Sequence, residues 1–132
     1  MFGYIMSDYD KKVYSEEIAE FLPQNIVDTH THVYIKDGES KTSGEERKGC
    51  VQWTKMVAED CSIEDLVQTY KDLLPGKNVK PVIFGSPTAR PLEKTNDYIV
   101  DCMKKTNYPG LFCTHSDMSA EYVEEQVIKG GF

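Results

Sequence analysis

The sequence has 132 residues, of which 39% are hydrophobic and 28% are charged, and its formal net charge at pH 7 is −7. This length suits a single domain of roughly 100–200 residues that can bury its own hydrophobic core. The acidic balance argues against binding to nucleic acid or to an anionic membrane surface, because both need a basic patch. The sequence also lacks any run of ~20 apolar residues that could span a membrane, so neither kind of partner is expected.

The four cysteines of the chain favour a cytoplasmic protein with reduced thiols. They are Cys50, Cys61, Cys102 and Cys113, and no two of them form a Cys-x-x-Cys pair. The opening residues MFGYIMSDYDKK lack the charged start and the long apolar run of a signal peptide. We therefore expect mostly buried thiols in a cytoplasmic protein. A disulfide framework in a secreted protein is the alternative.

The first part of the chain is expected to form a helix, a strand and a long loop. Apolar residues recur on one face from residue 7 or 8 to residue 22, and Pro23 follows them, which predicts a helix. Residues 25–34 are apolar enough for a strand. Residues 35–61 are rich in glycine, serine and charge, and then contain VQWTKMV, in which Trp53 can anchor a packed flap. Ordered loops of this length are usually binding loops or lids.

The rest of the chain alternates helices with short apolar strands. The expected elements are a helix capped by Ser62 and ended by Pro75-Gly76, a strand over residues 79–85, a helix over residues 92–105, a strand over residues 111–114, and a helix capped by Ser119 that ends at Gly130-Gly131. Strands that are separated by helices pair in parallel through right-handed crossovers. The expected fold class is therefore α/β, with a parallel sheet whose strands are buried on both faces.

The stretch NIVDTHTHVY holds two of the three histidines of the chain, His30 and His32. Because side chains alternate along a strand, Asp28, His30 and His32 are expected to share one face, and Val27, Thr29, Thr31 and Val33 the face that packs against helices. Burying such polar groups without partners costs several kcal/mol. A divalent cation would satisfy both imidazoles, with Asp28 as a ligand or as an acceptor behind a ligand. A hydrogen-bonded core histidine beside an exposed one is the alternative.

His115 is the third histidine, and it follows the last predicted strand as His32 closes the first. The carboxyl ends of parallel strands meet at one edge of a sheet, where ligands bind. A catalytic zinc needs about three protein ligands and a water. His115 is therefore a candidate third ligand or a neighbour of the metal, and a solvent-facing loop residue is the alternative.

IVDTHTHVY resembles the first strand of the amidohydrolase superfamily, whose members carry a His-x-His motif after an acidic residue. TNDYIVDCMKKTNYPGLFCTHSDMSAEYVEEQVIKGGF resembles the amidohydrolase-2 branch, and together the two stretches extend the resemblance over about residues 25–132. The resemblance implies a (β/α)8 TIM barrel with one divalent metal, most often zinc. It implies a hydrolase or a non-oxidative decarboxylase of small carboxylated substrates, with His30 and His32 as metal ligands and the other ligands and the general base on later strands.

A complete barrel takes roughly 250 residues, so the resemblance predicts one partial (β/α) barrel domain over residues 1–132, with about three strand–helix units after an N-terminal helix. We expect this segment to be inactive alone, with no catalytic residue of its own, and to form a homo-oligomer through its open sheet edges. Arg90 could hold a substrate carboxylate, with a solvated turn residue as the alternative, and Trp53 could close over the substrate.

Two other functions remain open. One is a small metal-binding or self-associating half-barrel protein without catalysis. The other is a fragment of a TatD-like or PHP-like metal-dependent phosphoesterase.

Overall fold

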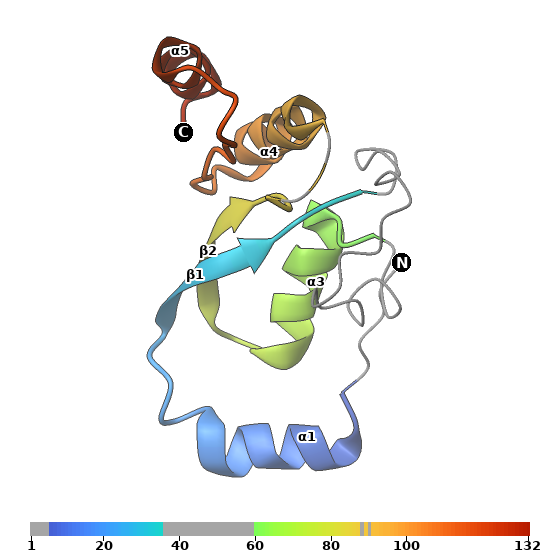
Figure 1. Cartoon of the computed structure of the whole chain (residues 1–132). Coiled ribbons are helices and arrows are strands. Elements are labelled where there is room, and N and C mark those ends of the chain that lie inside the picture. The colour runs from blue at the N-terminus through green and yellow to red at the C-terminus, as the bar shows by residue number, and fades with distance from the viewer. Residues whose placement is uncertain (1–5, 36–59, 88, 90) are drawn as a thin grey trace.

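The computed structural model of the chain describes residues 6–35, 60–87, 89 and 91–132 (Figure 1). Its elements in chain order are α1 (Asp8–Val13), the π-helical turn η1 (Tyr14–Ile18), β1 (Asn25–His32), α3 (Ile63–Leu73), β2 (Asn78–Phe84), α4 (Leu92–Thr106) and α5 (Ala120–Gly130). The described residues thus form a mixed α/β fold with an open, two-stranded parallel sheet. Most of the predicted loop over residues 35–61, with Trp53, lies outside the described residues, as does Arg90.

Serine caps start the helices where the sequence predicts them. The Ser62 hydroxyl accepts a hydrogen bond from the N–H of Asp65, whose carboxylate accepts from the Ser62 backbone in return. Ser119 caps α5 in the same way through the N–H of Tyr122. Each cap is worth about 1 kcal/mol because it satisfies a backbone donor at the helix start. The α5 helix ends at Gly131, whose φ of 76° is a left-handed conformation that glycine adopts without strain.

The first helix is shorter than predicted. It runs as an α-helix over Asp8–Val13 and continues as the wider η1 turn, so the expectation that it reaches residue 22 is wrong. Two side chains then hold this region against the start of β2. The Tyr14 hydroxyl donates to the carbonyl of Pro75 at 2.8 Å, and the Lys77 ammonium donates to the carbonyls of Ala19 and Leu22. Figure 1 accordingly shows α1 at the amino ends of the strands.

A β-bulge in β1 changes which side chains share a face. The strands pair in register up to Asp28 and Pro81, and pairing resumes between Thr31 and Ile83, which is three residues further along β1 but two along β2. The extra residue reverses the alternation of side chains. Asp28 therefore shares a face with Thr31, and the prediction that it shares one with His30 and His32 is wrong. Val27, which was expected to face the helices, is 66% exposed.

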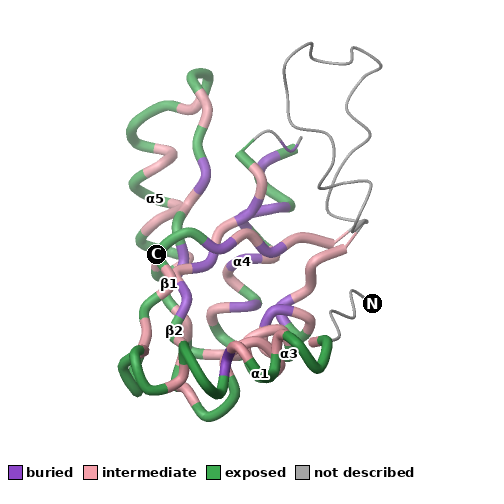
Figure 2. Tube along the Cα trace, turned by 90° about the horizontal axis from the view of Figure 1, so that it is seen from below, coloured by how far each residue is buried: buried purple, intermediate pink, exposed green. Residues whose placement is uncertain are grey.

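The core lies between the sheet and the helices α3 and α4. Its buried members come from the residue that follows β1, from α3, from β2 and from α4: Val33, Ile63, Leu66, Ile83, Ile99 and Cys102. In Figure 2 buried stretches, in purple, lie on the traces of the sheet and of the helices. Each fully buried aliphatic side chain contributes about 1.5–3 kcal/mol. The sequence analysis expected β1 to be buried on both faces. The exposure of Val27 shows that this expectation is wrong.

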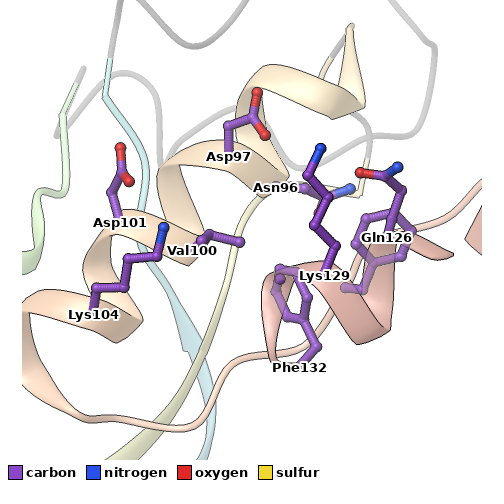
Figure 3. A pocket seen from close by; sticks show the side chains of 10 residues that line it. Asn96, Asp97, Val100, Asp101, Lys104, Gln126, Lys129 and Phe132 are labelled. Carbon is purple, nitrogen blue, oxygen red and sulfur yellow. The ribbon is translucent and has the colours of Figure 1, made fainter. Parts of the chain in front are cut away.

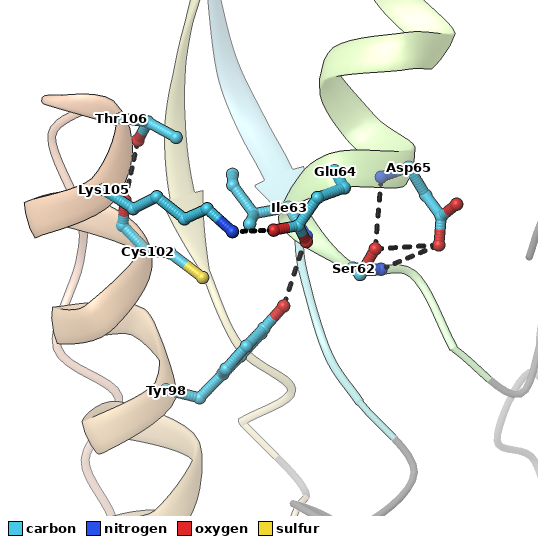
Figure 4. Close-up of polar contacts among 8 residues, drawn as sticks. All are labelled: Ser62, Ile63, Glu64, Asp65, Tyr98, Cys102, Lys105 and Thr106. Atoms are coloured by element: carbon cyan, nitrogen blue, oxygen red, sulfur yellow. Dashed lines mark hydrogen bonds and ion pairs between the residues drawn. The ribbon is translucent and has the colours of Figure 1, made fainter.

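The α3 and α4 helices are also joined by polar contacts at one end (Figure 4). The first N–H of α3, that of Ile63, donates to the hydroxyl of Tyr98 on α4 at 3.2 Å. The Glu64 carboxylate forms an ion pair with the Lys105 ammonium, and both side chains are more than half exposed. Tyr98 thus takes up a helix-start donor that would otherwise need water.

The predicted strand over residues 111–114 does not form. The segment touches β2 through one isolated parallel bridge between Ile83 and Gly110. Two backbone hydrogen bonds of 2.9 Å make this bridge, from Ile83 N–H to Pro109 and from Leu111 N–H to Ile83. Beyond it, the side chain of Asn96 rather than β2 bonds the backbone of Cys113. The ladder therefore ends where the third strand was expected to begin.

Candidate metal site

The carboxyl end of β1 presents two imidazoles side by side. The ring centroids of His30 and His32 lie 5.2 Å apart, with the ring planes at 72°. Phe84, the partner of His32 on β2, contacts both rings, at 5.1 Å from His30 and 4.3 Å from His32. The paired ends of the two strands therefore build this cluster, in which the ordinary alternation of a strand keeps both histidines on the same side of β1.

His32 is oriented by a backbone carbonyl. Its Nδ1 atom lies 3.0 Å from the carbonyl oxygen of Gly85. A carbonyl oxygen can only accept a hydrogen bond, so this contact requires the proton on Nδ1. The lone pair of the neutral ring is then on Nε2. Metal-binding histidines commonly have this arrangement, with one ring N–H donated to a carbonyl and the other nitrogen directed at the cation.

His30 is exposed, and its ring nitrogens have no hydrogen-bond partner among the described residues. Two imidazoles that bind one zinc tetrahedrally, at ~2.1 Å from each nitrogen, have centroids about 5 Å apart. The observed 5.2 Å separation matches that requirement. The separation of the two rings is thus compatible with one shared divalent cation.

Asp28 is engaged on the other side of the strand. Its carboxylate accepts a hydrogen bond from the Tyr70 hydroxyl at 2.8 Å and another from the backbone N–H of His30 at 3.1 Å. Partial burial raises the pKa of Asp28, but the bonds from Tyr70 and from the His30 backbone outweigh it and hold this pKa below its usual value. Burial raises the pKa of Tyr70 well above its usual range, so this hydroxyl remains a donor. Asp28 thus fixes the backbone at the bulge.

His115 is bonded within its own loop. Its Nδ1 atom accepts the backbone N–H of Asp117 at 3.2 Å and lies 3.5 Å from the Asp117 carboxylate. Within residues 6–35, 60–87, 89 and 91–132, no three His, Cys, Asp or Glu side chains come close enough to hold a metal. The structure therefore brings His30 and His32 together but does not add His115 or Asp28 to them as further ligands.

Comparison with protein-family models, with curated proteins and with solved structures finds no match. The assignment of this site therefore depends on the contacts of its own residues.

The sequence did not single out Gly85, which contacts His32, or Asn96, which contacts Cys113. Gly85 supplies the carbonyl to His32, and a Cβ atom there would lie 1.9 Å from Cγ2 of Thr95, so only glycine fits. Asn96 is 3% exposed and bonds both backbone groups of Cys113. The signal for Asn96 was a polar amide on the apolar face of a predicted helix. Gly85 carried no signal beyond its place at the end of a strand.

The three thiols that the structure describes show no sign of a reactive site. Cys61, Cys102 and Cys113 are free, as expected, and the latter two are buried. Burial raises the pKa of all three thiols, which keeps them protonated. Buried, protonated thiols are poor nucleophiles.

A cleft of about 350 Å³ lies elsewhere, between α4 and α5 (Figure 3). Val100 and the edge-to-face pair of Phe112 and Phe132 supply its apolar walls. Its other lining residues are Asn96, Asp97, Asp101, Lys104, Gln126, Lys129 and Gly130. None of these residues belongs to β1 or β2, so the cleft is separate from the histidine pair. In the part of the chain that the structure describes, no helix has the length and apolar character needed to cross a bilayer.

Proposed function

We propose that His30 and His32 bind a divalent metal, with zinc as the first choice. The observation that carries this proposal is the hydrogen bond from His32 Nδ1 to the Gly85 carbonyl. It leaves Nε2 of His32 available beside a second imidazole at a suitable distance. A bound metal of this kind would supply Lewis acidity toward a carbonyl and would lower the pKa of a bound water.

The wider proposal is that the chain supplies the first metal-binding strand of an amidohydrolase-2-like hydrolase or non-oxidative decarboxylase. The order β1–α3–β2–α4 with parallel pairing of β1 and β2 supports a (β/α) barrel segment. The substrate would be a small carboxylated molecule. Two imidazoles are fewer than the roughly three protein ligands of a catalytic zinc. We therefore propose that the described residues hold part of a metal site and do not catalyse by themselves.

Zinc titration of the purified chain tests the metal site directly, by calorimetry and by competition with a coloured chelator. We expect one zinc per chain, and a loss of at least about tenfold in affinity in both His30→Ala and His32→Ala, because each removes one of two ligands. His115→Ala is the matched control, since it removes an imidazole that the structure does not place with the pair. Unchanged zinc affinity in His30→Ala and in His32→Ala contradicts the proposal. A loss of affinity in His115→Ala would mean that His115 is a further ligand of the site.

A second candidate is a self-associating metal-binding protein without catalysis. Val27, which is 66% exposed on an edge strand, favours it, because such edges pair with other chains. We expect Val27→Lys to lower the dimer fraction in sedimentation at micromolar concentrations. Thr29→Lys, at another exposed position of β1, shows whether any added lysine has that effect. A wild-type chain that sediments as a monomer at every concentration rules this candidate out.

A further inference from the structure

The buried amide of Asn96 replaces a strand partner. Its Nδ2 group donates to the carbonyl of Cys113 at 2.9 Å, and its Oδ1 atom accepts the N–H of Cys113 at 2.9 Å. The side chain therefore bonds both backbone groups of one residue, as a neighbouring strand would. Asn96 is 3% exposed, so these bonds are made away from solvent.

This pairing diverts a bond that a regular parallel ladder would make. Ile83 bonds the carbonyl of Pro109 and the N–H of Leu111. Bonds in a parallel ladder are evenly spaced, so the next pair would bring the N–H of Cys113 to the carbonyl of Gly85. That N–H instead bonds Asn96 Oδ1. The Gly85 carbonyl is thereby released from the ladder.

The released carbonyl is the acceptor that orients His32. Gly85 O lies 3.0 Å from His32 Nδ1, and among the described residues it also accepts from the thiol of Cys113, at 3.8 Å. The thiol is a weak donor, so the imidazole N–H is the stronger partner. A chain of contacts therefore runs from Asn96 through Cys113 and Gly85 to His32.

We propose that Asn96 is a positioning residue for His32. By taking the N–H of Cys113, it keeps a stronger donor than the thiol away from the Gly85 carbonyl, which then holds the His32 proton on Nδ1 and so presents Nε2. The role of this geometry in metal binding rests on the proposed function. The tautomer of His32 does not, because it can be measured in the metal-free chain.

The first measurement is the His32 tautomer in the metal-free chain, read from long-range ¹H–¹⁵N NMR spectra at high pH with the ring neutral. The wild type is expected to show the Nδ1–H form. Asn96→Leu releases the Cys113 N–H to compete for Gly85, so the Nδ1–H fraction should fall at least severalfold. Asn96→Asp keeps an acceptor for that N–H and is expected to retain the wild-type tautomer. If Asn96→Leu does not fold, Asn96→Ser, whose hydroxyl is too short to make both bonds, takes its place.

The second measurement is zinc affinity in the same variants. Loss of a group that orients a metal ligand typically costs 10–100-fold in affinity, and we expect that loss in Asn96→Leu but not in Asn96→Asp. A wild-type Nε2–H tautomer overturns the positioning role, and so does an Asn96→Leu chain with unchanged tautomer and affinity. A chain that shows the predicted tautomers but binds no zinc overturns the proposed function and leaves the positioning role intact.

Discussion

The carboxyl end of β1 and the α4–α5 cleft differ in what they offer a ligand. The cleft has about 350 Å³ of space, which falls in the usual range for small-molecule sites. Its charged lining residues, such as Lys104 and Lys129, are exposed. At the histidine pair, a backbone carbonyl instead fixes the proton of His32 on one ring nitrogen. The comparison teaches that the oriented lone pair of His32 Nε2 is a better guide to candidate chemistry here than the volume of the α4–α5 cleft.

The two regions should respond very differently to an added methyl group, and this is the largest effect that we expect. In Gly85→Ala the new Cβ meets Thr95 Cγ2 at 1.9 Å in the core, which should cost about 2 kcal/mol or more of unfolding free energy. In Gly130→Ala the new Cβ meets the ring of Phe132 at 2.6 Å, but alanine favours the helix by up to ~1 kcal/mol. We expect the second variant to unfold within about 1 kcal/mol of the wild type in urea, because the ring can turn.

The double variant Gly85→Ala/Thr95→Ser checks the cause. Serine lacks the Cγ2 atom, and the next contact, Thr95 Cβ, is at 3.4 Å. Most of the lost stability should therefore return. A double variant as unstable as Gly85→Ala alone would mean that the clash with Thr95 is not the reason.

A smaller effect is expected at the hydroxyl that supports the bulge. Tyr70→Phe removes the donor to Asp28, which should cost about 1–2 kcal/mol at neutral pH because the acceptor is ionised. Folding lowers the pKa of Asp28 below its usual value of 3.8, so the stabilisation is present above that pH and is lost as the pH falls through the folded-state pKa. Tyr70→Phe should therefore flatten the fall of unfolding free energy between pH ~5 and pH ~2.

Tyr98→Phe is the matched control for this pH dependence. Its hydroxyl accepts the backbone N–H of Ile63 and has no hydrogen bond to a carboxylate among the described residues, although the Glu64 charge lies near it. It should lower the unfolding free energy by about 1 kcal/mol at every pH without changing the acid slope. An acid slope that is the same in Tyr70→Phe and in the wild type would show that Asp28 contributes nothing through this bond.

Local signals predicted much of the fold. The caps at Ser62 and Ser119 and the glycine stop at Gly131 were readable because each depends on a few neighbouring residues. The bulge in β1 was not readable, because it depends on the register against β2. The strand over residues 111–114 failed for a related reason, since a side chain distant in sequence takes the ladder bond.

The site was predictable in the same partial way. The sequence identified His30 and His32 from their spacing, and the structure places their rings together. It could not show that Gly85 orients His32, because that contact joins residues 53 positions apart. It also could not show that the Asp28 side chain faces Tyr70, because this orientation results from the bulge in β1.

The smallest effect is expected at the exposed ion pair of Figure 4. Glu64 and Lys105 join α3 to α4, but their side chains are 58% and 62% exposed. Exposed pairs contribute little, because water solvates both charges and salt screens them. Lys105→Ala should therefore leave the urea midpoint of unfolding unchanged within error, at low salt and in 1 M NaCl. The neighbouring Tyr98→Phe should lower it, because it leaves a backbone N–H in a half-buried place without its acceptor. A larger loss in Lys105→Ala than in Tyr98→Phe would reverse this ranking. It would mean that exposed charges contribute more than a half-buried hydrogen bond at the α3–α4 contact. The argument that favours the hydrogen-bonded His32 over the exposed charged residues of the α4–α5 cleft would then fail.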